Sequence, residues 1–151
     1  MGEAVGQSLE YLIAPAFGDG LPVNMQLANK VQGWVKRPGL LASFVQSNIA
    51  DILYERDSAL RGTVRRIDYE PGKNYVTTGE VISQAVRYMG ERPRRTALIA
   101  QAWHGPRALR LCAESGLDVT VGEFVDDFSP SDPQPWVRNW LVWVFKESTS
   151  R

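Results

Sequence analysis

The stretch TALIAQAWHGPRALRLCAESGLDVTVG, residues 96–122, predicts a strand, a turn, a helix and a second strand. It begins with an apolar run at residues 96–100 and ends with another at residues 119–121. Residues 106–115, between the two runs, have helical spacing, and Gly116 is a typical helix stop. The stretch therefore predicts one βαβ unit, in which a helix joins two parallel strands.

The helix of this unit has one apolar face and one basic face. The apolar face is predicted to hold Leu109, Cys112 and Ala113, with arginines opposite. Cys112 is the single cysteine of the chain, so it cannot form an intrachain disulfide. Its place on the buried face predicts an inert core thiol rather than a nucleophile.

Strands and helices also alternate in the rest of the chain. Short apolar runs predict strands at residues 11–16, at residues 40–45 and, at an edge of the sheet, at residues 63–67. Pro15 indicates that the first of these strands ends there. Helical spacing predicts helices at residues 24–36 with Asn24 as cap, at residues 47–54 with Ser47 or Asn48 as cap, and from the capping box Thr77–Glu80 to Gly90. An acidic, proline-rich loop is expected at residues 123–135.

This alternation predicts a three-layer α/β/α Rossmann-like sandwich with a mainly parallel sheet. The 151 residues, 44% of them hydrophobic, suffice for one core, so we expect a single domain over residues 1–151. The tail at residues 148–151 is expected to be frayed.

The composition excludes several classes of function. Lys+Arg and Asp+Glu both number 17, and this balance argues against nucleic acid or an anionic membrane as partner. No apolar run approaches the roughly eighteen residues that span a bilayer, and no basic leader precedes one, so we expect a cytoplasmic protein. One histidine and one cysteine exclude a structural zinc site in practice, and we expect no metal.

The familiar cofactor and nucleophile motifs are missing too. The chain contains no GxGxxG after its first strand, no GxxxxGK[ST] and no GxSxG, so no cofactor can be named from its sequence. Ligands of parallel α/β sheets bind at the carboxyl ends of the strands. The polar or glycine residues expected there are Gly18, Asp19, Ser47, Asn48, Thr77, Thr78, Glu80, Gln101, Trp103, His104, Gly105 and Arg107.

The sharpest of these signals is His104-Gly105-Pro106-Arg107 at the start of a helix. Gly105 allows close approach of a ligand, and the amides of a first helical turn favour an anion. Arg107 adds a bidentate donor suited to phosphate or carboxylate, and His104 is a candidate hydrogen-bond donor or general acid/base. A structural alternative is equally open, in which His104 caps the helix and Arg107 pairs with an acid.

Two further candidates have ordinary structural explanations. The capping box fully accounts for Glu80 and Thr77, although the carboxylate of Glu80 would also orient His104 or polarise a water if it faced the sheet edge. Trp103 follows a strand directly, where it would stack on a flat ligand or close the loop against the body of the protein.

The pattern of residues 74–122 resembles the domain of unknown function 218 family, the group of YdcF-, SanA- and ElyC-like proteins, in its short soluble form. There a threonine-rich segment with a glutamate precedes a hydrophobic strand and a His-x-x-Arg at the next helix start. Thr77, Glu80, His104 and Arg107 match those positions. The resemblance implies a Rossmann-like fold whose motif residues gather at one sheet edge, and S-adenosylmethionine has been proposed as a ligand of members.

Two hypotheses for function follow. The first is binding of a small anionic or nucleotide-like ligand, with or without catalysis, in which His104 and Glu80 would be the catalytic residues. The second is a non-catalytic interaction module. Its basis is the helix expected at residues 136–147, where Trp136, Trp140 and Trp143 form an apolar stripe with Val144. Such a helix is either deeply buried or the contact of a homodimer.

Overall fold

A computed structural model describes residues 9–18, 20–68, 76–90 and 95–126, together with residues 141, 144, 146 and 147. It contains a five-stranded, wholly parallel sheet with the strand order β3-β2-β1-β4-β5. The strands are β1 (Tyr11–Ala14), β2 (Ala42–Gln46), β3 (Val64–Ile67), β4 (Arg95–Gln101) and β5 (Asp118–Val125). The helices are α2 (Leu21–Trp34), α3 (Ser47–Arg56), the 3-10 helix η1 (Ser58–Gly62), α4 (Thr78–Met89) and α5 (Gly105–Glu114).

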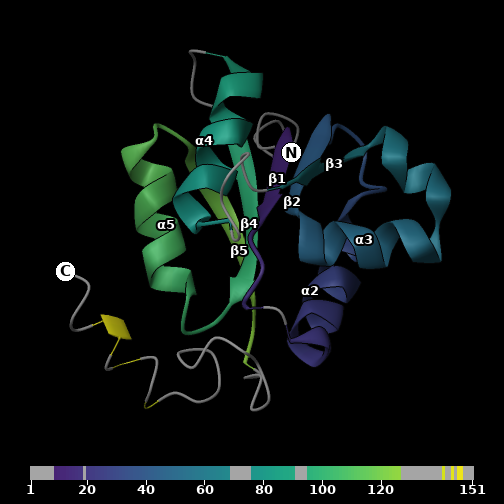
Figure 1. Ribbon diagram of the computed structural model, residues 1–151. Coiled ribbons are helices and arrows are strands. Elements are labelled where there is room, and N and C mark those ends of the chain that lie inside the picture. Colours follow the sequence, from purple (N-terminus) through teal and green to yellow (C-terminus); the bar gives the residue numbers. More distant parts are fainter. Residues whose placement is uncertain are drawn as a thin grey trace.

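Helices cover both faces of the sheet, so the predicted three-layer α/β/α sandwich is confirmed. Figure 1 shows the sheet between α2 and α3 on one side and α4 and α5 on the other. Successive residues of a strand point to opposite faces, and the core divides accordingly. Leu12 packs with the α2 and α3 residues, while its neighbour Ile13 packs with those of α4 and α5.

The strand order places a topological switch point between β1 and β4. β2 pairs with one side of β1, and β3 pairs with β2 at that edge of the sheet. The chain then returns to the centre, where β4 pairs with the other side of β1 and β5 pairs with β4. The loop after β1 leads to α2 on one face of the sheet, and the loop after β4 leads to α5 on the other face. Ligands of α/β proteins commonly bind at such a switch point.

The central strands are buried because helices pack on both of their faces. Every residue of β1 and β2 is buried, as expected for a parallel sheet that is covered twice. By contrast, β3 exposes its two middle residues, Arg65 and Arg66, which agrees with the predicted edge position.

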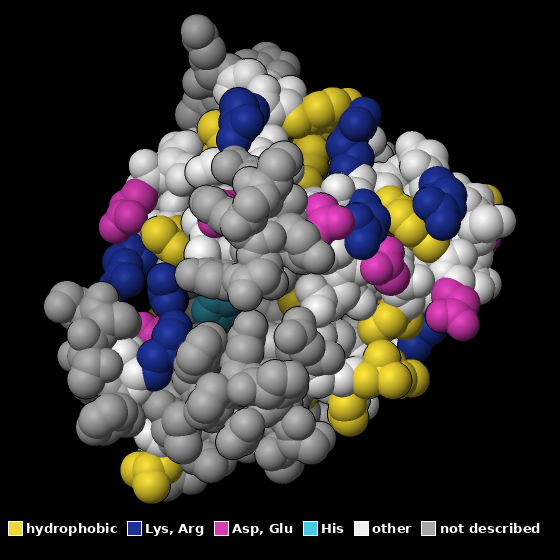
Figure 2. All heavy atoms as spheres, in the orientation of Figure 1, with side chains coloured by type: hydrophobic (Ala, Val, Ile, Leu, Met, Phe, Trp, Pro, Cys, Tyr) yellow, Lys and Arg dark blue, Asp and Glu magenta, His cyan; other side chains and the backbone are white. Residues whose placement is uncertain are grey.

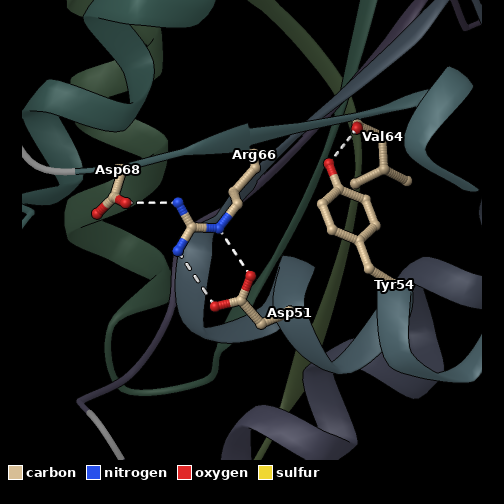
Figure 3. Close-up of polar contacts among 5 residues, drawn as sticks. All are labelled: Asp51, Tyr54, Val64, Arg66 and Asp68. Carbon is tan, nitrogen blue, oxygen red and sulfur yellow. Dashed lines mark hydrogen bonds and ion pairs between the residues drawn. The ribbon is translucent and has the colours of Figure 1, made fainter. Parts of the chain in front are cut away.

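Polar contacts tie this edge strand to α3 (Figure 3). Arg66 donates to Asp51 of α3 at 2.7 Å and also pairs with Asp68, so its guanidinium lies between two carboxylates. The Tyr54 hydroxyl donates to the carbonyl of Val64 at 2.6 Å. These contacts are exposed or only partly buried, and we assign them a structural role at the edge.

Several predicted boundaries were wrong for physical reasons. The first helix begins at Leu21 rather than Asn24, since Gly20 is the N-cap and Pro22 fits the first turn. The end of β1 at Ala14 agrees with the prediction that the strand stops at Pro15, which cannot donate to a ladder. β5 continues to Val125, so the expected loop begins later than residue 123.

The apolar face predicted for α5 was wrong as well. Ala108 and Cys112, four residues apart, are buried, whereas Leu109 is 37% exposed and Ala113 is exposed. Residue 109 lies about 100° around the helix from residue 108, so this rotation moves Leu109 to the rim. The prediction of a buried thiol is confirmed, and burial raises the pKa of Cys112 to about 11.

The capping box prediction is confirmed for its threonine. The hydroxyl of Thr77, the N-cap of α4, accepts a hydrogen bond from the Glu80 amide at 3.1 Å. α4 ends at Gly90, whose φ of 89° suits glycine. Within the part of the chain that the structure describes, no helix is long and apolar enough to cross a bilayer.

Candidate functional site

The carboxyl ends of β1 and β4 carry the loops that border the switch point. Residues 15–18 and 20 follow β1, and residues 102–104 follow β4 and lead directly into α5. Because β1 and β4 are hydrogen-bonded neighbours, these two loops lie at the same edge of the sheet. Of the residues predicted for the first loop, Gly18 is here with a φ of 70°, and Asp19 lies outside the described residues.

Two buried amide side chains hold the loop after β1. Gln46, the last residue of β2, accepts a hydrogen bond from the Ala16 amide at 2.9 Å. Asn24 accepts from the Phe17 amide at 3.3 Å and donates to the carbonyl of Gly18 at 3.0 Å. Sequence reasoning had taken Asn24 for a helix cap, yet it is 1% exposed and fixes the loop that precedes its own helix.

A third amide side chain, Gln101, holds the loop after β4 in the same way. Its Oε1 accepts from the amides of Trp103 at 2.7 Å and His104 at 3.1 Å, and its Nε2 donates to the carbonyl of Asp126 at 3.4 Å. Gln101 is fully buried. The structure thus gives it a clear role in ordering the loop, while its predicted contact with a ligand stays a prediction.

The histidine that follows this loop joins the starts of two helices. His104 is the N-cap residue of α5, but its side chain makes no capping bond. Instead its Nε2 lies 2.7 Å from the hydroxyl of Thr78, the first residue of α4. The imidazole also packs on Phe17 from the loop after β1, with ring centroids 6.2 Å apart. His104 is only 5% exposed, so it lies where two loops and two helix starts meet.

The surroundings of His104 keep its imidazole neutral. Burial is the main cause that lowers its pKa to about 3, and the positive charges of Arg107 and Lys146 lower it further. At pH 7 the ring is therefore a neutral hydrogen-bonding group with one donor and one acceptor nitrogen. Burial and Arg107 also lower the pKa of Lys146, whereas the carboxylate of Glu147 raises it.

Arg107 and Lys146 bring two cations to the start of α5. Arg107 Nη1 lies 3.6 Å from Glu147 Oε1, and 34% of the arginine side chain is exposed. Figure 2 shows Lys and Arg side chains gathered on the side of the molecule that α5 covers. Sequence reasoning missed Lys146 and Glu147, because nothing in the chain signals that residues about forty positions further on return to this helix.

The remaining predicted residues fall into two groups. Trp103, at 44% exposure, and Gly105 adjoin His104 directly, and Thr77 and Thr78 begin α4 across from it. Glu80 is also in the first turn of α4, and one of its carboxylate oxygens is buried. The 2.7 Å contact with His104, however, is made by Thr78.

The second group of predicted site residues, Ser47 and Asn48, lies at the start of α3, directly after the carboxyl end of β2. Ser47 and Asn48 are the first two residues of α3, and neither is its cap, because Gln46 takes the N-cap position. The prediction that one of them caps the helix was wrong. β2 lies on the far side of β1 from β4, so this group is one strand removed from the switch point.

Gly105 is required by its neighbour on β5. A Cβ at this position would lie 2.7 Å from the ring of Phe124, closer than packed atoms approach, and Gly122 is similarly placed at 2.9 Å. Glycine thus lets the first turn of α5 pack tightly against the aromatic ring of Phe124, which itself remains 38% exposed.

The described residues contain no cluster of three or more His, Cys, Asp or Glu that could hold a metal ion. Comparison of the chain with models of protein families, with curated proteins and with solved structures finds no match.

Proposed function

We propose that the protein binds a small anionic or nucleotide-like ligand at the carboxyl ends of β1 and β4, beside the start of α5. One observation carries this proposal: Arg107, whose side chain is 34% exposed, lies in the first turn of α5, which directly follows the buried N-cap residue His104. The positive charges of Arg107 and Lys146 both lower the pKa of His104, so both cations lie near this helix start. Cations placed around a helix N-terminus create a positive potential that favours an anion.

Each group of the site has a distinct role in this proposal. The amides of the first turn of α5 and the guanidinium of Arg107 hold the anion, and that turn contains no acidic residue to oppose it. The neutral imidazole of His104 contributes hydrogen bonding together with Thr78. The exposed ring of Trp103 offers a surface for a flat part of the ligand.

Side-chain hydrogen bonds hold the described parts of the surrounding loops. Gln46, Asn24 and Gln101 tie down backbone amides and carbonyls of the loops after β1 and β4. A preorganised loop loses little conformational entropy on binding, so more of the contact energy contributes to affinity.

Hydrogen bonding is the role we propose for His104, in preference to acid/base catalysis. A general acid or base is most effective when its pKa lies near the working pH, and that of His104 lies far below. We therefore infer that the site binds its ligand, with His104 as a hydrogen-bonding group. The resemblance to the domain of unknown function 218 family, and a cytoplasmic location, are parts of the same proposal.

A thermal-shift screen of nucleotides, sugar phosphates, inorganic phosphate and S-adenosylmethionine tests the proposal. A ligand that raises the melting temperature of the wild-type protein should lose this effect in Arg107→Ala. Arg110→Ala is the matched control, because Arg110 is on the same helix and, among the described residues, forms its ion pair with Glu114 one turn away. We expect the control to retain the full shift.

The screen can also contradict the proposal. If no anion stabilises the wild-type protein, or if both arginine variants keep the shift, the start of α5 is not the binding site. Circular dichroism of Arg107→Ala separates lost binding from lost folding.

A second candidate is self-association through the C-terminal residues. Among the described residues, Leu141 is 63% exposed and Val144 is 40% exposed, so apolar surface is present there. The tryptophans of the predicted stripe lie outside the described residues. Light scattering checks this candidate: a dimer that Leu141→Asp converts to a monomer supports it, and a wild-type monomer counts against it.

A further inference from the structure

Glu147 already supplies a carboxylate to the proposed anion site. Its Oε1 lies 3.6 Å from Arg107 Nη1, and its side chain is only 16% exposed. It also raises the pKa of Lys146, so its negative charge acts on both cations of the site. An incoming anion would have to interact with these same two positive groups.

The distance between Glu147 and Arg107 indicates a loose pair. A charge-assisted hydrogen bond between a guanidinium and a carboxylate is about 2.7–2.9 Å long. At 3.6 Å the guanidinium and the carboxylate attract each other without the short hydrogen bonds of a bidentate pair. A ligand that offers several oxygens with better geometry can replace this carboxylate.

We propose that Glu147 is a resident competitor of the ligand: its carboxylate occupies the anion position at Arg107 and Lys146, and a phosphate group displaces it on binding. This inference rests on the proposed function and adds the regulation of the same site. Phosphate is the favoured ligand class, because a dianion with three free oxygens outcompetes a single carboxylate for two cations.

A neighbouring ion pair on the same helix provides the comparison. Arg110 and Glu114 are 3.9 Å apart, one helical turn from each other, with both side chains more than half exposed. Such exposed ion pairs contribute little to the free energy of unfolding. Glu114→Gln therefore makes the same chemical change as Glu147→Gln beside an arginine of the same helix, but away from His104.

Titration with inorganic phosphate, followed by calorimetry, tests this proposal. In Glu147→Gln the Kd for phosphate should fall by about tenfold relative to wild type, a change equal to about 1.4 kcal/mol. Glu114→Gln should bind phosphate like the wild type. Glu147→Asp keeps the charge on a shorter side chain and should give an intermediate Kd, and it serves as the second variant if Glu147→Gln does not fold.

The outcomes separate this inference from the proposed function. If the wild type binds phosphate and Glu147→Gln binds it equally or more weakly, Glu147 is not a competitor, while the anion site itself stands. If neither protein binds phosphate, both the anion site and the competitor role fail. Phosphate binding by both proteins, tighter in Glu147→Gln than in the wild type and removed from both by Arg107→Ala, supports the competitor role most strongly.

Discussion

At the scale of single residues, the histidine of the site behaves unlike a typical surface histidine. His104 is buried between Phe17, Thr78 and two cations, so its protonation is opposed both by the loss of water and by like charge. The sequence identified His104 and Arg107 by their place at a helix start. It gave no indication that the imidazole would be neutral, since burial and the approach of Lys146 depend on tertiary structure.

The lowered pKa of His104 has a consequence for stability. Because the folded-state value of about 3 lies below the ordinary 6.5, the unfolded chain binds more protons between these two values. The free energy of unfolding should therefore fall as the pH drops from about 6.5 toward 3, by up to about 1.4 kcal/mol per pH unit from this group. Urea denaturation from pH 7 to pH 4 measures it.

The variant His104→Gln isolates this contribution. It removes the titrating group while keeping a polar side chain of similar reach, so its stability should depend less steeply on pH than that of the wild type. Equal slopes for the two proteins would show that the pKa of His104 is the same in the folded and unfolded states, and would contradict the lowered value.

At the scale of elements, the position of α5 decides whether a site exists at all. The helix packs its first turn against Phe124 of β5, and the loop before it is fixed by Gln101. Periodicity predicted the existence of α5 and nearly its bounds. It misplaced the buried face by one residue, because Leu109 is the more apolar residue although Ala108 is the one that is buried.

Gly105→Ala tests the close packing of α5 on β5. The added methyl group would meet the Phe124 ring at 2.7 Å, so we expect a loss of about 1–2 kcal/mol in the free energy of unfolding. Gly33→Ala in α2 is the control, since nothing lies within 4 Å of its Cβ position, and it should gain about 0.5–1 kcal/mol. If urea denaturation shows both variants equally stable, Phe124 does not pack on this turn.

At the scale of the whole molecule, the alternation of strands and helices was enough to predict the three-layer sandwich and the edge of the sheet that carries the candidate residues. The strand order was not predictable, because local patterns do not specify which strands pair. That order matters for the site, since it brings the loops after β1 and β4 together and leaves Ser47 and Asn48 one strand away.

Contacts between residues that are distant in the sequence explain why the roles of four further residues were not predicted. Asn24 and Gln46 look like a helix cap and a turn residue, yet they fix a loop on a neighbouring strand. Lys146 and Glu147 reach α5 from the far end of the chain. Their roles depend on tertiary packing, which a pattern of local propensities does not contain.

The central claim, that an anion binds at the start of α5, is tested most directly by an NMR titration of the amide resonances with inorganic phosphate. We predict that the largest shifts fall on Gly105, Arg107 and Ala108, with smaller ones at Thr78, and that Arg107→Ala abolishes them while Arg110→Ala does not. Shifts that spread evenly over the surface, or that cluster at the start of α3, would contradict the claim.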